Sequence, residues 1–167
     1  MSNKLPCLVA ATILLFSIQA NAQEKQEKSA NNDKPQKKSL FNEKLAKRLG
    51  ADEYGMKSYV LVTLITGKNK VDDPKESKKL FAGHFANMKR LAKEGKLVLS
   101  GPFVDGRPKR GLFIFNVVTL EEAEKLVKSD PAVKAGVFDY EMTKLYASAA
   151  LMQINQIHSR IQKTKIE

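Results

Sequence analysis

The spacing of apolar residues predicts four β-strands and two main helices in the central part of the chain. A β-branched and aromatic run over 57–66 predicts the first strand. A helix follows over 74–94, because Asp73 and Pro74 form a helix start and Gly95 a stop. The later apolar runs predict short strands over 96–99 and 111–118, a helix from 120 to about 130, and a fourth strand over 137–145. The predicted order β-α-β-β-α-β is typical of the ferredoxin-like α+β fold.

Shorter helical patterns flank this core at both ends. Ser39 precedes a short apolar stripe that ends at Gly50, which predicts a small helix with Ser39 as its N-cap. Near the other end, apolar residues recur at helical spacing at positions 151, 154, 157 and 161. This pattern predicts a C-terminal amphipathic helix within 147–167, after a domain that spans 56–146.

The first and third predicted strands carry apolar side chains on both faces. In the first strand, Val60, Val62 and Leu64 share one face, and Tyr59, Leu61 and Ile65 share the other. Two helices cover only one face of a four-stranded sheet, so something else must cover the second face. We expect a second copy of the chain, which gives a homodimeric α+β barrel with a cavity between the sheets. The alternative is that the C-terminal helix folds back over its own sheet.

The N-terminal segment has the pattern of a secretory signal peptide. Over 1–22, Lys4 precedes an apolar run at 8–16 and the small-x-small sequence Ala20-Asn21-Ala22. The run is too short for a lasting anchor, which takes about 20 apolar residues. We therefore expect a secreted or periplasmic protein without stable membrane insertion after cleavage. The polar composition that follows predicts a disordered tether and then the short helix within 23–55.

The charge of the chain is basic but dispersed. The formal net charge of +11 is spread along the 167 residues, and predicted secretion and the absence of nucleic-acid-binding motifs argue against a nucleic-acid partner. A small anionic ligand, an anionic surface or plain solvation of the lysines fits better. We expect no cofactor or metal: nucleotide-binding glycine motifs are absent, and the two histidines, His84 and His158, lack metal-ligand spacing. Thiol chemistry is excluded because cleavage removes Cys7, the one cysteine.

Five short motifs follow one another along the predicted domain, at 83–85 (Gly-His-Phe), 94–103, 110–115, 121–123 and 129–136. Their order and spacing over 59–161 resemble the YCII-related family of small dimeric α+β barrel proteins, in particular its secreted branch. The resemblance implies the dimeric barrel and a site around His84 and Asp130, but no settled substrate. The chain departs from the family pattern at Ser100, where alanine is usual, and at Leu145, where an aromatic residue is common.

His84 and Asp130 each admit a structural and a chemical interpretation. His84 lies on the apolar stripe of the first helix, where a core histidine with one hydrogen bond is common. Imidazole titrates near neutrality, however, and a carboxylate partner would orient it as a general acid or base. Asp130 precedes Pro131 and either closes a helix and starts a turn or serves as that partner.

The segment Ser100-Gly101-Pro102 is the third part of the predicted site. We expect it to form one side of a cleft, in which the Gly101 N–H faces an anionic ligand and Ser100 adds a hydroxyl. Ser100 lacks the Gly-x-Ser-x-Gly surroundings of a nucleophile. Helical spacing places Lys89, with its basic neighbours on the first helix, on a solvated face away from His84. His158 is expected to face solvent or a neighbouring helix.

Two functions fit these residues. The first is a small cofactor-independent enzyme that uses His84 and Asp130 for acid–base chemistry on a small anionic or aromatic molecule. The second is a non-catalytic secreted module of the same fold, in which both residues support a ligand pocket or the core. The sequence does not decide between them.

Overall fold

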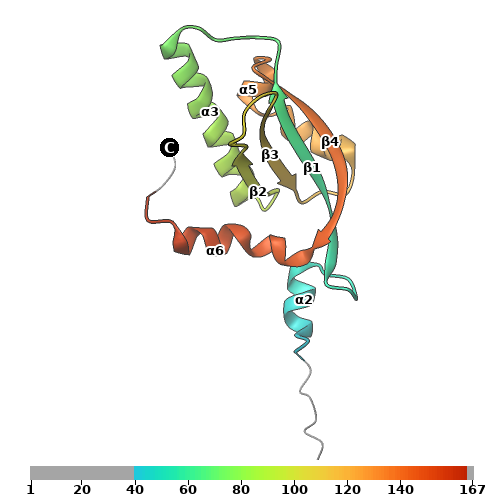
Figure 1. Ribbon diagram of the computed structural model, residues 1–167. Helices are drawn as coiled ribbons and strands as arrows, with labels where there is room; N and C mark the ends of the chain where they lie inside the picture. The colour runs from blue at the N-terminus through green and yellow to red at the C-terminus, as the bar shows by residue number, and fades with distance from the viewer. Residues whose placement is uncertain (1–39, 165–167) are drawn as a thin grey trace, which may run out of the picture. The chain divides into compact units, whose positions relative to one another are not determined.

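The computed structural model describes residues 40–164 and contains a four-stranded antiparallel sheet in the order β2-β3-β1-β4 (Figure 1). The strands are β1 (Met56–Thr66), β2 (Leu97–Pro102), β3 (Lys109–Phe115) and β4 (Phe138–Ser148). This order, with a helix after β1 and another after β3, is the ferredoxin-like arrangement, so the predicted fold class is confirmed. The predicted signal peptide and the tether up to residue 38 lie outside the described residues.

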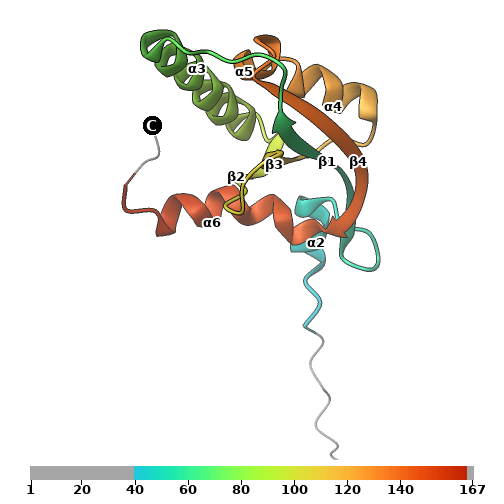
Figure 2. The same ribbon diagram turned by 45° about the horizontal axis from the view of Figure 1, so that its top comes forward.

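The helices lie on both sides of the sheet. Helices α3 (Pro74–Lys93), α4 (Leu120–Val127) and α5 (Pro131–Lys134) are on one side, and α6 (Ile154–Ile161) is on the other (Figure 2). A 3-10 helix, η2 (Ala149–Gln153), leads from β4 into α6, and α2 (Glu43–Leu49) precedes β1. Within residues 40–164, none of the helices has the length and apolar character needed to cross a membrane.

Several boundaries differ from the sequence prediction. Strand β3 ends at Phe115 and not at residue 118, and β4 continues to Ser148, past the predicted end at residue 145. Strand β2 continues through Gly101 and Pro102, past the predicted end at residue 99, because Pro102 is at the end of an edge strand, where a missing N–H is tolerated. The helix predicted to reach about residue 130 ends at Val127, and α5 is a separate turn capped by Asp130. Helix α2 is capped by Asn42, whose side chain accepts a hydrogen bond from the Leu45 N–H, and not by Ser39.

The main hydrophobic core lies between the sheet and helices α3 and α4. Val60, Val62 and Leu64 of β1 are buried there beside Phe113 and Phe115 of β3. The helices contribute Leu91, Ala123 and Val127. The alternation of side chains along β1 and β3 is therefore as the sequence predicts.

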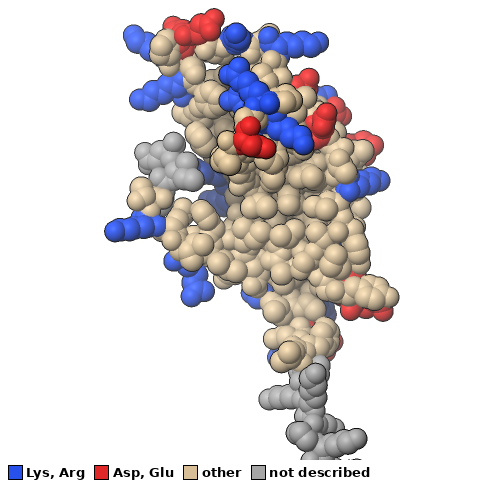
Figure 3. Space-filling view, in the orientation of Figure 1, with Lys and Arg blue, Asp and Glu red and all other residues tan. Residues whose placement is uncertain are grey.

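The second face of the sheet carries a smaller apolar cluster around Tyr59, Val98 and Ile114. Leu151 and Met152 of η2 pack against it, so the C-terminal segment covers part of this face, as the alternative interpretation proposed. Other apolar side chains of this face are only half-buried, namely Leu61, Leu99, Leu112 and Leu145. Figure 3, which views this side, shows a broad surface without charged side chains over β1, β4 and the start of α6. Homodimer formation through this face remains a prediction.

Candidate active site around His84 and Asp130

The helix α3 carries His84 on the side that faces the sheet. The helix starts at Asp73, whose side chain accepts from the Lys75 N–H, and its apolar residues recur at steps of three and four. This spacing places His84 on the same side as Leu80 and Leu91 and leaves only 7% of the residue exposed. Burial of a polar ring requires a hydrogen-bond partner.

That partner is Asp130, which is fully buried between α4 and α5. Its Oδ1 accepts a hydrogen bond of 2.8 Å from the Ala132 N–H and so caps α5, while its Oδ2 accepts one of 2.6 Å from His84 Nδ1. The structure thus brings together the two residues that the sequence singled out, which are 46 positions apart. Asp130 has both of its possible roles at once, because one oxygen closes the turn and the other binds the imidazole.

A close helix contact beside the pair sets its geometry. Gly83 on α3 packs against Pro131 at the start of α5. A Cβ atom at Gly83 would lie 3.1 Å from Pro131 Cγ, which is closer than an ordinary van der Waals contact. The missing side chain therefore lets α3 approach α5 closely enough for His84 to reach Asp130.

The hydrogen bond determines which ring nitrogen is free. A carboxylate only accepts, so the neutral imidazole carries its proton on Nδ1 and has a lone pair on Nε2. Nε2 forms no hydrogen bond within residues 40–164, and no buried side-chain nitrogen or oxygen in that range lacks a partner. Nε2 is therefore accessible to solvent, and it is the atom that can accept a proton from a bound molecule.

Aromatic rings surround the imidazole. The ring centroids of Phe85 and Phe138 lie 5.4 and 5.6 Å from that of His84, and those of Phe113 and Phe81 lie 6.0 and 6.2 Å away. These apolar neighbours strengthen the hydrogen bond to Asp130 by excluding water from it. They also hold the imidazole ring in one orientation.

A cavity of about 540 Å³ opens beside His84, between α3, α6 and the edge strand β2. Ser100, Gly101 and Pro102 line it, as the sequence predicted for one side of a cleft. Leu145, where the family often has an aromatic residue, belongs to the second-face cluster and does not line this cavity. Most of the remaining wall is apolar, from Leu64, Phe81, Phe85, Met88, Ala92, Leu97, Leu99, Leu112, Phe113, Phe138 and Ile154.

The cavity also has basic lining residues that the sequence reading missed. Lys89 and His158 line it. Both are exposed, as the sequence predicts, but Lys89 does not lie away from the site, and that part of the prediction is wrong. His158 reaches it because α6 lies along β2, where Asn155 Nδ2 donates a 2.7 Å hydrogen bond to the Leu97 carbonyl oxygen. The helical spacing predicts which side of α6 is apolar, but it does not predict that α6 packs along β2.

Arg110 was also missed, because its direction depends on a β-bulge. Leu64 pairs with Gly111 and the next residue, Ile65, pairs with Lys109, so Arg110 is an extra residue in β3. A bulge interrupts strand alternation and redirects a side chain. The Arg110 guanidinium carbon consequently lies 5.5 Å from the centroid of the Phe138 ring, which also borders His84.

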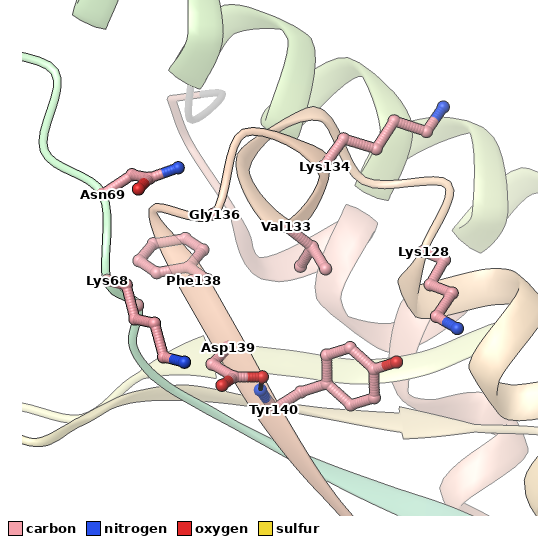
Figure 4. A pocket seen from close by; sticks show the side chains of 10 residues that line it. Lys68, Asn69, Lys128, Val133, Lys134, Gly136, Phe138, Asp139 and Tyr140 are labelled. Carbon is pink, nitrogen blue, oxygen red and sulfur yellow. Dashed lines mark hydrogen bonds between the residues drawn. The ribbon is translucent and has the colours of Figure 1, made fainter.

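A second cavity, of about 560 Å³, lies beyond α5 and the start of β4. Lys68, Lys128 and Lys134 stand around it, but Figure 4 shows that their ammonium groups point in different directions. Lys128 also forms a 2.7 Å ion pair with Glu124, which lowers the pKa of that carboxyl. The polar groups of the second cavity therefore do not converge on one point. Separately, within residues 40–164 no cluster of three or more His, Cys, Asp or Glu side chains is arranged to hold a metal ion.

Comparison with known proteins identifies the family of the chain. No curated protein sequence matches this chain. In structure, the chain is similar to 5-chloro-2-hydroxyhydroquinone dehydrochlorinase (TftG) from Burkholderia phenoliruptrix AC1100 in complex with 2,5-dihydroxybenzoquinone. That match has 17% identity and a TM-score of 0.38, and it covers 50% of this chain and 90% of the other. The sequence profile of the YCII-related domain matches residues 59–145, more than half of the chain, so the protein belongs to the YCII-related family.

Proposed function

We propose that the protein is a small cofactor-independent enzyme that uses His84 and Asp130 for acid–base chemistry on a small anionic or aromatic molecule. One observation carries this proposal: His84 Nδ1 lies 2.6 Å from Asp130 Oδ2, and the same histidine lines a cavity of about 540 Å³. A histidine oriented by a carboxylate beside a mostly apolar cavity is the arrangement of a general base.

In the proposed mechanism, Nε2 of His84 removes a proton from the bound molecule. Asp130 then stabilises the imidazolium ion through the hydrogen bond at Nδ1. The imidazolium returns the proton to another atom of the molecule or to a leaving group. Proton removal from the bound molecule serves isomerisation or elimination. In hydrolysis, Nε2 instead takes the proton of the attacking water, and the imidazolium gives it to the leaving group. The aromatic wall keeps other water away from the transferred proton.

The experiment is a substrate screen with one compound class for each reaction type: hydrolysable esters, enolisable carbonyl compounds and β-substituted acids that undergo elimination. For any compound that the wild-type protein turns over, we expect His84→Asn and Asp130→Asn to lower kcat at least about 100-fold. The matched control is Val127→Ala, which removes a fully buried side chain of the core and leaves the pair intact. Loss of roughly 2 kcal/mol of stability in this control should not change kcat. Turnover that survives His84→Asn contradicts the proposal.

A non-catalytic module is the second candidate, and the burial of His84 favours it. The residue is 7% exposed and has four phenylalanine neighbours, as a structural histidine of the core would. In that case, no compound in the screen is turned over, and both substitutions act mainly on the free energy of unfolding.

We also propose that the protein acts outside the cytoplasm, as its first 22 residues suggest, and as a homodimer. The support for the dimer is the uncharged surface over β1 and β4 (Figure 3) and the half-buried leucines of the second sheet face. A stable interface on this face needs about 1,000 Å² of buried area.

A further inference from the structure

We propose that Arg110 is the anion-binding residue of the His84 cavity and that the ligand of this cavity is a small ring compound bearing a carboxylate. The inference rests on the cavity being the ligand site, as the proposed function requires, but it does not depend on turnover.

The backbone of β3 directs Arg110 into the cavity. Arg110 is the extra residue of the bulge between the pairs Leu64–Gly111 and Ile65–Lys109. Its carbonyl oxygen accepts a 3.0 Å hydrogen bond from the Phe103 N–H, which holds the bulge against the segment that follows β2. Bulges of this kind redirect a side chain next to a functional site.

Contact with an aromatic ring holds the guanidinium in place. Its central carbon lies 5.5 Å from the centroid of Phe138, within the range of a cation–π interaction. The centroid of the same ring lies 5.6 Å from that of His84, so Phe138 contacts both the cation and the base. A ligand bound by Arg110 therefore lies near the imidazole.

The positive charge of Arg110 has no acidic partner within residues 40–164. It forms no ion pair there, and none of the residues that line the cavity in this range is Asp or Glu. Arg110 is half-buried and has no anion beside it, so its guanidinium is available to a ligand, and the planar donors of that group match the two oxygens of a carboxylate.

The rest of the wall indicates what the carboxylate is attached to. Apolar side chains form most of the wall and include four phenylalanines, which favours a flat apolar body over a sugar or a peptide. Lys89 also lines the cavity, but it is exposed and its flexible ammonium does not offer two parallel donors. The arginine is therefore the better carboxylate site.

The test is binding of benzoate to the protein, measured from shifts of backbone and imidazole NMR signals. We expect benzoate to bind the wild-type protein more tightly than benzamide, its uncharged analogue, and more tightly than inorganic phosphate, which lacks the ring. Arg110→Gln should raise the Kd for benzoate at least about tenfold and leave the Kd for benzamide unchanged. Arg110→Lys should give an intermediate Kd, because it keeps the charge and loses the paired donors.

The matched control is Lys109→Gln, which removes the same charge from the neighbouring exposed residue and should change the Kd less than about twofold. The inference is overturned if benzoate does not bind, if phosphate binds as tightly, or if Lys89→Gln or His158→Gln abolishes binding while Arg110→Gln does not. If benzoate binds through Arg110 but no compound is turned over, the inference stands and the proposed enzyme function fails. If a compound is turned over, and Arg110→Gln changes neither its turnover nor the Kd for benzoate, only the inference about Arg110 fails.

Discussion

Replacing Asp130 by asparagine should move a proton in the candidate site without changing its shape. The Ala132 N–H is a fixed donor, so the asparagine oxygen must remain where Asp130 Oδ1 now accepts it at 2.8 Å. The amide nitrogen then takes the place of Oδ2, 2.6 Å from His84 Nδ1. Because this nitrogen only donates, the neutral imidazole must carry its proton on Nε2 and lose the basic lone pair that faces the cavity.

The cost in stability should distinguish this variant from Asp130→Ala. Asparagine keeps the cap and replaces a charge-assisted hydrogen bond by a neutral one, which costs about 1 kcal/mol. Alanine loses the cap, worth about 1 kcal/mol, and leaves the buried Nδ1 without a partner, which costs a further 1–3 kcal/mol or so. We therefore expect a total loss of about 2–4 kcal/mol for Asp130→Ala.

Two measurements check this reasoning. Urea denaturation gives the free energy of unfolding of the wild-type protein and both variants. Long-range proton–nitrogen NMR of the imidazoles, recorded while the pH is raised until the spectrum stops changing, shows which nitrogen is protonated. The chain has only two histidines, so a His158→Gln background leaves His84 as the single signal.

The reasoning is refuted by either of two results. One is an Asp130→Asn protein in which His84 still carries its proton on Nδ1. The other is an Asp130→Ala protein that unfolds within about 0.5 kcal/mol of the wild type, because the pair would then be neither a cap nor a buried hydrogen bond of normal strength.

Three further predictions concern other parts of the fold. In Gly83→Ala, the new Cβ would lie 3.1 Å from Pro131 and should push α3 and Pro131 apart by a few tenths of an ångström. We expect a melting temperature near that of the wild type, because the higher helix propensity of alanine offsets the strain, and a faster solvent exchange of the His84 Nδ1 proton, because its hydrogen bond to Asp130 is weakened. An unchanged exchange rate argues against the idea that this contact sets the geometry of the pair. The pKa of Asp52 is lowered because the Tyr146 hydroxyl and the Met56 N–H donate hydrogen bonds to its carboxylate. These hydrogen bonds therefore stabilise the folded protein at a pH above the ordinary pKa of about 4, and this contribution is lost as the pH falls below that value. The stability difference between wild type and Tyr146→Phe should therefore shrink between pH 7 and about pH 3, and a difference independent of pH contradicts the assignment. Light scattering should report twice the chain mass for the homodimer, whereas a single mass would refute it.

The sequence predicts the sheet and the positions of His84 and Asp130 because both depend on local rules. Steps of three and four place His84 on the inner side of α3, and Asp130 turns inward as the N-cap of α5, which begins at Pro131. The family resemblance names the same two residues. Their hydrogen bond then follows from the close contact of α3 with α5 at Gly83 and Pro131.

The basic lining of the cavity depends on structure that no local pattern encodes. Arg110 reaches the cavity through a bulge, and a bulge comes from the registers of two strand pairs at once. His158 reaches it because Asn155 binds the backbone of a strand 58 residues earlier. Periodicity identifies the face of an element, but it does not identify what the element packs against.

Helix α6 lines the cavity but lies outside the part of the chain that matches the family. The family match ends at residue 145, whereas Ile154, Asn155 and His158 form one wall of the cavity. Sequence change in this C-terminal segment can thus alter the size and charge of the cavity while the pair on α3 and α5 stays the same. Relatives that share 59–145 but continue differently after β4 should be compared by their C-terminal segments, because the matched domain alone does not determine the lining of the cavity.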